Sequence, residues 1–385
     1  MKAILEYSLY RRLKPTNQEM ACGYLPAGSV IEVTNILEGA TLDGISIWME
    51  ASDGFFYWCG GLNLNGNEVF LKWDQLDDVQ KSAVAASIVN DKSGWLKTQI
   101  TDYKGCAVGY KNDDTNGTIG LTIFVGKKEA AGTIGKTIYW KGMEVPVDFK
   151  ETGLIREFGF IKDNNADLLT PILVGGKISN GGQFWGTRSM CISKDGKNYL
   201  VTCFHVLLED LKKKEGVDVE FTDSRPSKVN AVFPFQNTGQ TYPIRQGIYN
   251  SERDFCIVEL PESFKMRNRI ALDILEGDIK NYVGYFELQM LQKKRLFMSG
   301  AKSGIQDSVV KETNGIVKFS TSPIEFHNLI ITSNMSSPGD SGAPVVDEQN
   351  NLVGIVIGGD EKSRTYILPV YGFLANNGYS LPKNE

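Results

Sequence analysis

One stretch near the C-terminal end constrains this chain most. It reads Ser336-Ser337-Pro338-Gly339-Asp340-Ser341-Gly342-Ala343-Pro344-Val345-Val346, and it is followed by the apolar run Leu352–Ile357 and the pair Gly358-Gly359. A serine between glycines, just ahead of two strand-like runs, is expected on a sharp turn with backbone N–H groups free to face an anion. A nucleophile for acyl transfer needs such a hydroxyl and such preorganised donors. Ser341 is therefore the candidate nucleophile.

The candidate base is one of only two histidines in the chain. His205 directly follows the strand-like run Tyr199–Phe204. We expect it at a bend between a strand and a helix, where its side chain can project into a cleft. A neutral imidazole, with an unperturbed pKa near ~6.5, can take the serine proton and return it to a leaving amine. His327 lies within or beside a strand, and we interpret it as structural.

The candidate orienting acid is Asp254, which directly precedes the hydrophobic run Phe255–Leu260. We therefore expect its carboxylate to lie at the edge of the protein interior. A buried carboxylate without a partner is costly, and a histidine N–H would satisfy it. Three other aspartates are nearer to His205 in sequence, but each falls in a polar stretch that is expected to be exposed. They are Asp210, Asp218 and Asp223.

Length and composition limit the remaining possibilities. The chain has 385 residues, which favours two or three domains, and its net charge of −5 gives no global attraction to nucleic acid or anionic membranes. The N-terminus lacks an apolar core of signal-peptide length, and no run is long enough to span a membrane. The six cysteines are scattered without metal-ligand spacing, so we expect reduced, buried thiols in a cytoplasmic protein, with no metal or cofactor. If the protein is exported after all, a disulfide between Cys191 and Cys203 is the alternative.

Residues 1–70 are predicted to form a small barrel, because short aromatic-rich strands alternate with Gly and Asn. The predicted strands are Val30–Val33, Ile45–Met49 and Phe55–Trp58. The order Leu25–Gly28, a strand bearing Trp48, then Asp53–Gly61 resembles bacterial Src-homology-3-like (SH3-like) domains. That resemblance implies binding of wall peptides or partner proteins, whereas core packing explains Trp48 and Trp58 equally well.

Residues 71–168 are predicted to form a small α+β domain. Asp74 is expected to cap a helix, with Asp77 at its third position. The apolar residues expected on one helix face are Leu76, Val79, Ala83 and Ala86. Strands are expected at Gly105–Tyr110, Gly120–Val125 and Glu144–Phe149. The runs Val108–Lys111, Leu121–Lys128, Val145–Asp148 and Glu151–Gly153 resemble the leader domain that precedes the protease in some bacterial trypsin-like proteins.

Residues 169–385 are rich in predicted strands and poor in predicted helices, which favours two antiparallel barrels. The predicted strands are Gln183–Ser193, Tyr199–Cys203, Val217–Phe221, Val229–Phe233, Phe255–Leu260, Val283–Phe297 and Gly315–Phe319. The basic cluster Lys293–Arg295 is interpreted as a solvated strand edge or turn.

This region resembles trypsin/chymotrypsin-like serine proteases with a double β-barrel. Four segments in order carry the resemblance: Thr202–Val206, Arg253–Val258, Gly339–Pro344 and Leu352–Gly359. The resemblance implies a catalytic triad of His205, Asp254 and Ser341. It also implies an oxyanion hole from the N–H groups of Gly339 and Ser341. Ile357, Gly358 and Gly359 would form the strand edge that pairs with the substrate backbone.

Two departures from the family pattern affect specificity and activation. In the family, the residue six positions before the nucleophile forms the floor of the primary specificity pocket. That residue is Met335 here, so we expect the pocket to prefer an uncharged or apolar substrate side chain. The run Ile172–Gly176 resembles the new N-terminus that secreted members expose on cleavage and that would pair with Asp340. However, Thr170 and Pro171 precede it with no basic residue, so we expect a single-chain enzyme completed by domain contacts or by a partner.

The sequence thus predicts a serine endopeptidase acting on protein or peptide substrates, with N-terminal domains for recruitment or regulation. The alternative is a protein-binding regulator that keeps a latent or self-cleaving protease fold. An exported, wall-binding enzyme is a third hypothesis, which rests on residues 1–70 alone.

Overall fold

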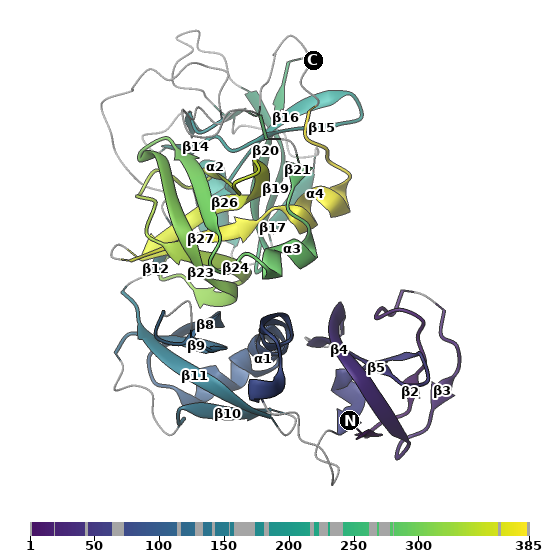
Figure 1. The fold of residues 1–385 in the computed structure, drawn as a ribbon. Coiled ribbons are helices and arrows are strands. Elements are labelled where there is room, and N and C mark those ends of the chain that lie inside the picture. Colours follow the sequence, from purple (N-terminus) through teal and green to yellow (C-terminus); the bar gives the residue numbers. More distant parts are fainter. Residues whose placement is uncertain are drawn as a thin grey trace. The chain divides into compact units, whose positions relative to one another are not determined.

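The chain folds into two compact units, Met1–Glu151 and Thr152–Glu385, which are described separately. The computed structural model describes residues 2–18, 20–42, 45–63, 73–113, 117–127, 134–140, 143–153, 155–157, 174–180, 185–215, 219–222, 230–231, 242–261, 268, 278–279, 281–360 and 363–382. Figure 1 shows their helices and strands coloured along the sequence. The domain boundaries expected after residues 70 and 168 both lie outside the described residues.

The first part of unit 1 is a five-stranded sheet in the order β6-β5-β4-β1-β7. Its strands are β1 (Lys2–Leu5), β4 (Val30–Leu42), β5 (Ile45–Ala51), β6 (Phe56–Trp58) and β7 (Leu62–Asn63), and β2 (Leu9–Tyr10) pairs with β3 (Tyr24–Leu25) beside them. Trp48 is only 2% exposed, and its indole N–H donates to the carbonyl of Ala40 at 2.9 Å. Core packing therefore accounts for Trp48.

The second part of unit 1 combines one helix with four strands. Helix α1 (Asp78–Gln99) begins after Asp77, which forms a capping box with Gln80. The expectation that Asp74 caps the helix was wrong, because Asp74 lies in a separate 3-10 turn, Trp73–Gln75. The placement of Val79 on the buried face was also wrong, since its side chain is 50% exposed.

The strands of this part are β8 (Tyr103–Tyr110), β9 (Ile119–Val125), β10 (Thr137–Trp140) and β11 (Met143–Glu151). Three of these four overlap the predicted strands, and they follow the order β10-β11-β9-β8. β11 and β9 run parallel, whereas the other two pairs are antiparallel.

The first sheet of unit 2 is antiparallel and follows the order β15-β16-β20-β19-β17, with β18 beside β19. Its strands are β15 (Cys191–Lys194), β16 (Lys197–Thr202), β17 (Val219–Thr222), β18 (Asn230–Ala231), β19 (Tyr242–Asn250) and β20 (Arg253–Leu260). Helix α2 (Phe204–Glu215) leaves the end of β16, and the pairing of Thr202 with Cys256 brings the start of α2 near the start of β20.

The second sheet of unit 2 closes on itself. The order β23-β22-β25-β26-β27-β24 returns to its start because β23 also pairs with β24. These strands are β22 (Arg295–Gly300), β23 (Gly304–Lys318), β24 (Glu325–Ser333), β25 (Pro344–Val346), β26 (Asn351–Asp360) and β27 (Arg364–Pro369). Two short strands, β12 (Ile155–Glu157) and β21 (Asn281–Tyr282), also pair with β26. The remaining elements are the pair β13 (Lys177–Ser179) and β14 (Trp185–Thr187), and the helices α3 (Tyr285–Gln289) and α4 (Tyr371–Asn377).

One predicted strand of unit 2 is partly helical. Within the expected strand Val283–Phe297, residues Tyr285–Gln289 form helix α3, and β22 begins only at Arg295. Lys293 between them has φ +67°, as in a turn, which agrees with the interpretation of the basic cluster.

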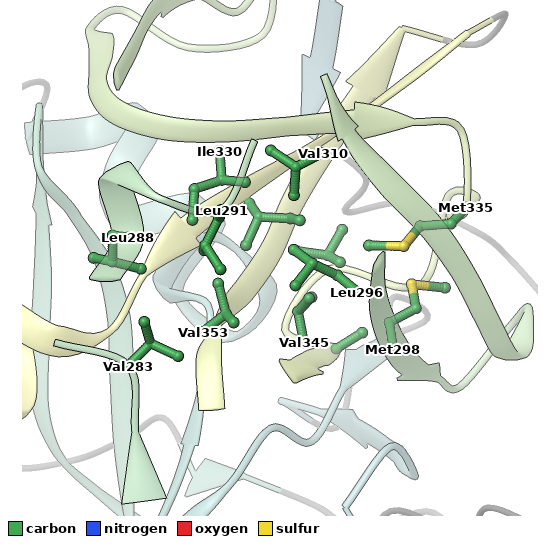
Figure 2. Packing of buried hydrophobic residues seen from close by; sticks show 13 residues of the cluster. Val283, Leu288, Leu291, Leu296, Met298, Val310, Ile330, Met335, Val345 and Val353 are labelled. Atoms are coloured by element: carbon green, nitrogen blue, oxygen red, sulfur yellow. The ribbon is translucent and has the colours of Figure 1, made fainter. Parts of the chain in front are cut away.

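A hydrophobic cluster fills the interior of this closed sheet (Figure 2). It consists of Val283, Leu288, Leu291, Leu296, Met298, Val310, Ile330, Met335, Ala343, Val345, Val353, Val356 and Ile367. Ala343 and Met335 flank the Ser341 loop in sequence, so the core anchors both ends of that loop.

All six cysteines are free thiols in the structure. Five are buried, as expected, and Cys22 is exposed. None of the helices in the part of the chain described here combines the length and apolar character needed to cross a membrane.

Candidate active site

His205 and Asp254 are brought together by the start of α2 and the start of β20. His205 Nδ1 lies 2.5 Å from Asp254 Oδ2, and the backbone N–H of His205 donates to Oδ1 at 3.1 Å. His205 is 1% exposed and Asp254 is fully buried. Because a carboxylate only accepts hydrogen bonds, the imidazole proton lies on Nδ1, which leaves Nε2 as an acceptor.

Ser341 completes this arrangement from the loop between β24 and β25. Its Oγ lies 2.9 Å from His205 Nε2 and 3.5 Å from the carbonyl oxygen of Ile357. With Nε2 free to accept, the hydroxyl of Ser341 donates its proton toward the imidazole. The structure therefore joins the three residues that sequence analysis selected into one hydrogen-bonded chain.

The loop around Ser341 requires glycine at two positions. Gly339 has φ +106° and Gly342 has φ +91°, a region that residues with a Cβ rarely adopt. A Cβ at Gly342 would overlap the carbonyl oxygen of Thr187 and lie 2.6 Å from Thr202 Oγ1. A Cβ at Gly339 would lie 2.9 Å from the ring of Trp185.

Backbone hydrogen bonds hold the same loop from both sides. The carbonyl of Ser341 accepts from the N–H of Thr187 at 2.8 Å, and the N–H of Gly342 donates to Val356 at 2.8 Å. The hydroxyl of Thr187 donates to the carbonyl of Gly339 at 2.9 Å. Within the described part of the chain, the N–H groups of Gly339 and Ser341 donate no hydrogen bond, so both are available to an oxyanion.

Asp340 is fully buried, and its carboxylate is satisfied by backbone N–H groups. Oδ1 accepts from Lys302 at 2.9 Å and from Ser303 at 3.1 Å, and Oδ2 accepts from Ser337 at 2.8 Å. The two bonds to Oδ1 tie the Ser341 loop to the turn between β22 and β23. Residue Ile172, the expected alternative partner, lies outside the described residues.

The four residues expected to bind substrate are all near this loop in sequence or space. Met335 is 4% exposed and belongs to the hydrophobic cluster, and its N–H donates to Thr365 Oγ1 at 3.0 Å. Ile357, Gly358 and Gly359 lie in β26, and the last two pair with β27 on one side. On its other side, β26 pairs at Gly358 and Gly359 with β12, so the edge predicted to receive substrate is already paired.

Sequence analysis missed two side chains near the loop. The indole ring of Trp185 lies next to Gly339, and Lys177 Nζ lies 4.3 Å from the centre of that ring. Thr187 supports the loop through both its hydroxyl and its N–H. A lone tryptophan or threonine on a short strand carries no local sequence signal for such a role.

One group of potential metal ligands overlaps the site. The ligand atoms of Cys203, His205 and Asp254 lie within 4.8 Å of one another. However, Nδ1 and Oδ2 are already hydrogen-bonded to each other, and the thiol of Cys203 donates to the carbonyl of Val356 at 3.4 Å. An ion here would have to replace these bonds, so the geometry fits acid–base chemistry better than metal binding.

Comparison with known proteins agrees with this geometry. Residues 187–355 match the family model of the trypsin-like peptidase domain, a range that includes His205, Asp254 and Ser341. The matched range lies within the second unit. No curated protein matches the sequence.

Similar solved structures are proteases of low sequence identity. Thermobifida fusca Protease A is 15% identical with a TM-score of 0.40, over 55% of this chain and 97% of that chain. A glutamic acid-specific serine protease that utilises a novel histidine triad in substrate binding is 18% identical with a TM-score of 0.42, over 55% of this chain and 100% of its own. Cellulomonas bogoriensis chymotrypsin is 16% identical with a TM-score of 0.40, over 55% and 98%.

Proposed function

We propose that this chain is a serine endopeptidase that cleaves protein substrates through an acyl-enzyme. The observation that carries the proposal is the buried hydrogen-bonded chain from Asp254 through His205 to Ser341, with contacts of 2.5 and 2.9 Å. A fully buried carboxylate and imidazole are costly to place together, and a purely structural role would be served by apolar side chains.

In the proposed reaction, His205 Nε2 takes the proton of Ser341 as Oγ attacks the substrate carbonyl carbon. The N–H groups of Gly339 and Ser341 stabilise the oxyanion, and Asp254 offsets the charge of the imidazolium. The imidazolium then gives its proton to the leaving amine, which leaves an ester on Ser341. Water, deprotonated by the same imidazole, hydrolyses that ester and regenerates the hydroxyl.

The enzyme is proposed to work as a single chain. In chymotrypsin-like activation by cleavage, a new terminal amine would pair with Asp340. Here three backbone N–H groups already satisfy this carboxylate, so the loop needs no further cation to hold it. Residues 1–70 and 71–168 are proposed to recruit substrate or an activating partner, and Met335 is proposed to favour an apolar side chain in the specificity pocket.

A fluorophosphonate probe tests this function because it modifies an activated serine without needing a substrate sequence. We expect labelling of the full chain that disappears in Ser341→Ala and falls strongly in His205→Gln. Ser337→Ala, four residues upstream in the same loop, is the matched control and should be labelled like the wild type. If no Ser341-dependent labelling occurs at any pH, the chain is better explained as a protein-binding regulator with a latent fold.

The pH dependence of labelling tests the role of His205 separately. Because the base must be neutral to accept a proton, the labelling rate should fall as pH drops through its pKa, for which the reference value is about 6.5. A rate that stays flat down to about pH 5 would contradict the assignment.

A further inference from the structure

The end of β26 next to Ser341 is paired with a segment of this same chain. Strand β12 runs antiparallel to β26, with Ile155 opposite Asp360, Arg156 opposite Gly359 and Glu157 opposite Gly358. β27 pairs with the other edge of β26 at the same two glycines. Both edges of this part of β26 are therefore used within the chain.

The direction of β12 is that of an extended chain entering the site. The carbonyl of Ile357, the residue before Gly358, lies 3.5 Å from Ser341 Oγ, so β26 approaches the nucleophile toward its Gly358 end. β12 runs from Asp360 toward Gly358, and it therefore approaches the nucleophile from its N-terminal to its C-terminal residue. A peptide that adds to a strand edge forms the same backbone hydrogen bonds, and one edge accepts one chain at a time.

Buried side chains and backbone groups anchor this segment. Ile155 is 2% exposed. Its carbonyl accepts two hydrogen bonds from Ser320, one from the backbone N–H at 2.8 Å and one from the side-chain hydroxyl at 3.0 Å. The hydroxyl of Thr152 donates to Asp360 Oδ2 at 3.0 Å. Asp360 is 1% exposed and is held by the N–H groups of Ser363 and Arg364, both at 2.7 Å.

The triad is assembled, and its side chains are buried in this arrangement. Ser341 is fully buried and His205 is 1% exposed, although their hydrogen bonds are complete. An enzyme restrained by a distorted nucleophile loop would lack these bonds. Occupation of the substrate edge leaves them intact.

We propose that β12 restrains the protease in cis by occupying the strand position that an extended substrate must take on Gly358–Asp360. This inference rests on the proposed function, since it assigns regulation to that site. Substrate binds only to the fraction of molecules in which β12 has left β26, so the apparent KM is raised by the inverse of that fraction, while kcat is unchanged. The pairing of β12 is thus the equilibrium that a substrate or an activating partner must shift.

The test compares the full chain with Arg156→Pro, which removes a backbone N–H from the centre of β12 and disfavours strand pairing. Fluorescein-labelled casein serves as the extended substrate, and a fluorophosphonate serves as a small probe that does not pair with β26. We expect Arg156→Pro to cleave casein at least about 10-fold faster below saturation, through a lower KM at constant kcat. Thr152→Val, which removes the hydroxyl that donates to Asp360, should give a smaller gain in the same direction.

Glu348→Pro is the matched control, because it places proline at the exposed second position of the turn Asp347–Asn350, where proline is favoured. Hydrogen exchange should show that Arg156→Pro remains folded and loses protection at Gly358–Asp360. If the wild type and Arg156→Pro are both labelled at Ser341 and cleave casein at the same rate, the role of β12 is overturned. The same holds if neither of them cleaves casein. Absence of Ser341-dependent labelling in every variant overturns the proposed function itself.

Discussion

The two units differ in the number of charged side chains that they bury. Among the described residues, unit 1 buries a single charged side chain, Lys150, whereas unit 2 buries several of both signs. Those of unit 2 are Lys177, Arg188, His205, Asp254, Glu312, Asp340, Asp360 and Arg364. Burying charge lowers stability unless geometry and partners compensate it. Among the described residues, unit 2 therefore uses part of its folding free energy to hold buried charges, whereas unit 1 buries only Lys150.

Unit 1 keeps a comparable polar group at its surface. Asp53 accepts hydrogen bonds from Tyr57 at 2.7 Å, from Arg11 at 3.1 Å and from the N–H of Phe55 at 3.1 Å. Partial burial raises the pKa of Asp53, but these hydrogen bonds outweigh it and hold the pKa below its usual value. If the contrast is real, substitutions of buried carboxylates in unit 2 should affect activity far more than substitution of Asp53.

The largest effect is expected from Asp254→Asn. An amide of the same shape would present N–H or C=O to His205 and favour the wrong imidazole tautomer, so kcat should fall by about 10⁴-fold while the fold is retained. Casein turnover and the melting temperature together measure this. An activity loss of less than about 10-fold would show that the buried carboxylate does not orient the base.

The second-largest effect, on both stability and labelling of Ser341, is expected from Gly342→Ala. Its φ of +91° and the overlap of the new Cβ with the carbonyl of Thr187 force the loop to move, so both melting temperature and labelling of Ser341 should fall. Strain of this kind costs on the order of 1–3 kcal/mol from the backbone alone.

Gly372→Ala is the control for that substitution. Gly372 lies in α4, and a Cβ there meets nothing within 4 Å, so alanine should leave labelling unchanged and slightly stabilise the helix. Equal loss of labelling in both variants would indicate general sensitivity of unit 2 rather than a constraint at the nucleophile loop.

A smaller effect is expected from Asp340→Asn. The amide can accept at one uncharged oxygen only, so at least one of the three N–H donors loses its acceptor, at a cost of about 1–3 kcal/mol in the free energy of unfolding. We expect labelling of Ser341 to slow by about 10-fold, because the loop that carries the oxyanion N–H groups is less well held.

Asp347→Asn provides the comparison for Asp340. Asp347 also accepts backbone N–H groups, from Gln349 at 2.9 Å and Asn351 at 2.8 Å, but in a partly exposed turn between β25 and β26. Its substitution should leave labelling unchanged. A similar slowing in both variants would remove the special role assigned to Asp340.

The smallest effect is expected from Asp53→Asn in unit 1. Because the folded pKa of Asp53 lies below its unfolded value of about 3.9, its stabilising contribution is present above that pH and is lost as pH falls through the folded pKa. Thermal unfolding should therefore show a slightly lower melting temperature than the wild type at pH 7, and the two curves should converge near pH 2. Asp195→Asn, on an exposed turn with φ +52° that suits either residue, is the control. A difference that persists unchanged at pH 2 would show that charge is not its cause.

The sequence predicted the parts of this site that depend on short local patterns. The strand Lys197–Thr202 followed at once by helix α2 was expected from an apolar run that ends at His205, and the glycines around Ser341 predicted a sharp turn. The position of Asp254 followed from a carboxylate at the head of an apolar strand. Such features are encoded within about ten residues, where propensity and periodicity act.

Long-range pairing could not be predicted in the same way. Three residues, Ile155–Glu157, show no periodicity, and their pairing with β26 depends on groups such as Ser320 and Asp360 that are far away in sequence. The helical turn Tyr285–Gln289 was missed because a short apolar segment satisfies strand and helix patterns alike. The cap at Asp77 was missed because Asp74 and Asp77 both suit an N-cap by type, and only the capping box with Gln80 distinguishes them.

The hydrogen bonds around the Ser341 loop also have a consequence for when the proposed active site can form. Ser341 meets His205 across 136 residues of chain, and the Gly339 carbonyl meets Thr187 across 152. Contacts of such separation form late, because the loop-closure entropy must be overcome first. During synthesis, a ribosome-bound chain that has not yet released residue 341 lacks a nucleophile altogether, so a nascent or truncated chain cannot cleave its surroundings. On the proposed function, the folding order itself delays proteolysis until the whole of unit 2 has emerged.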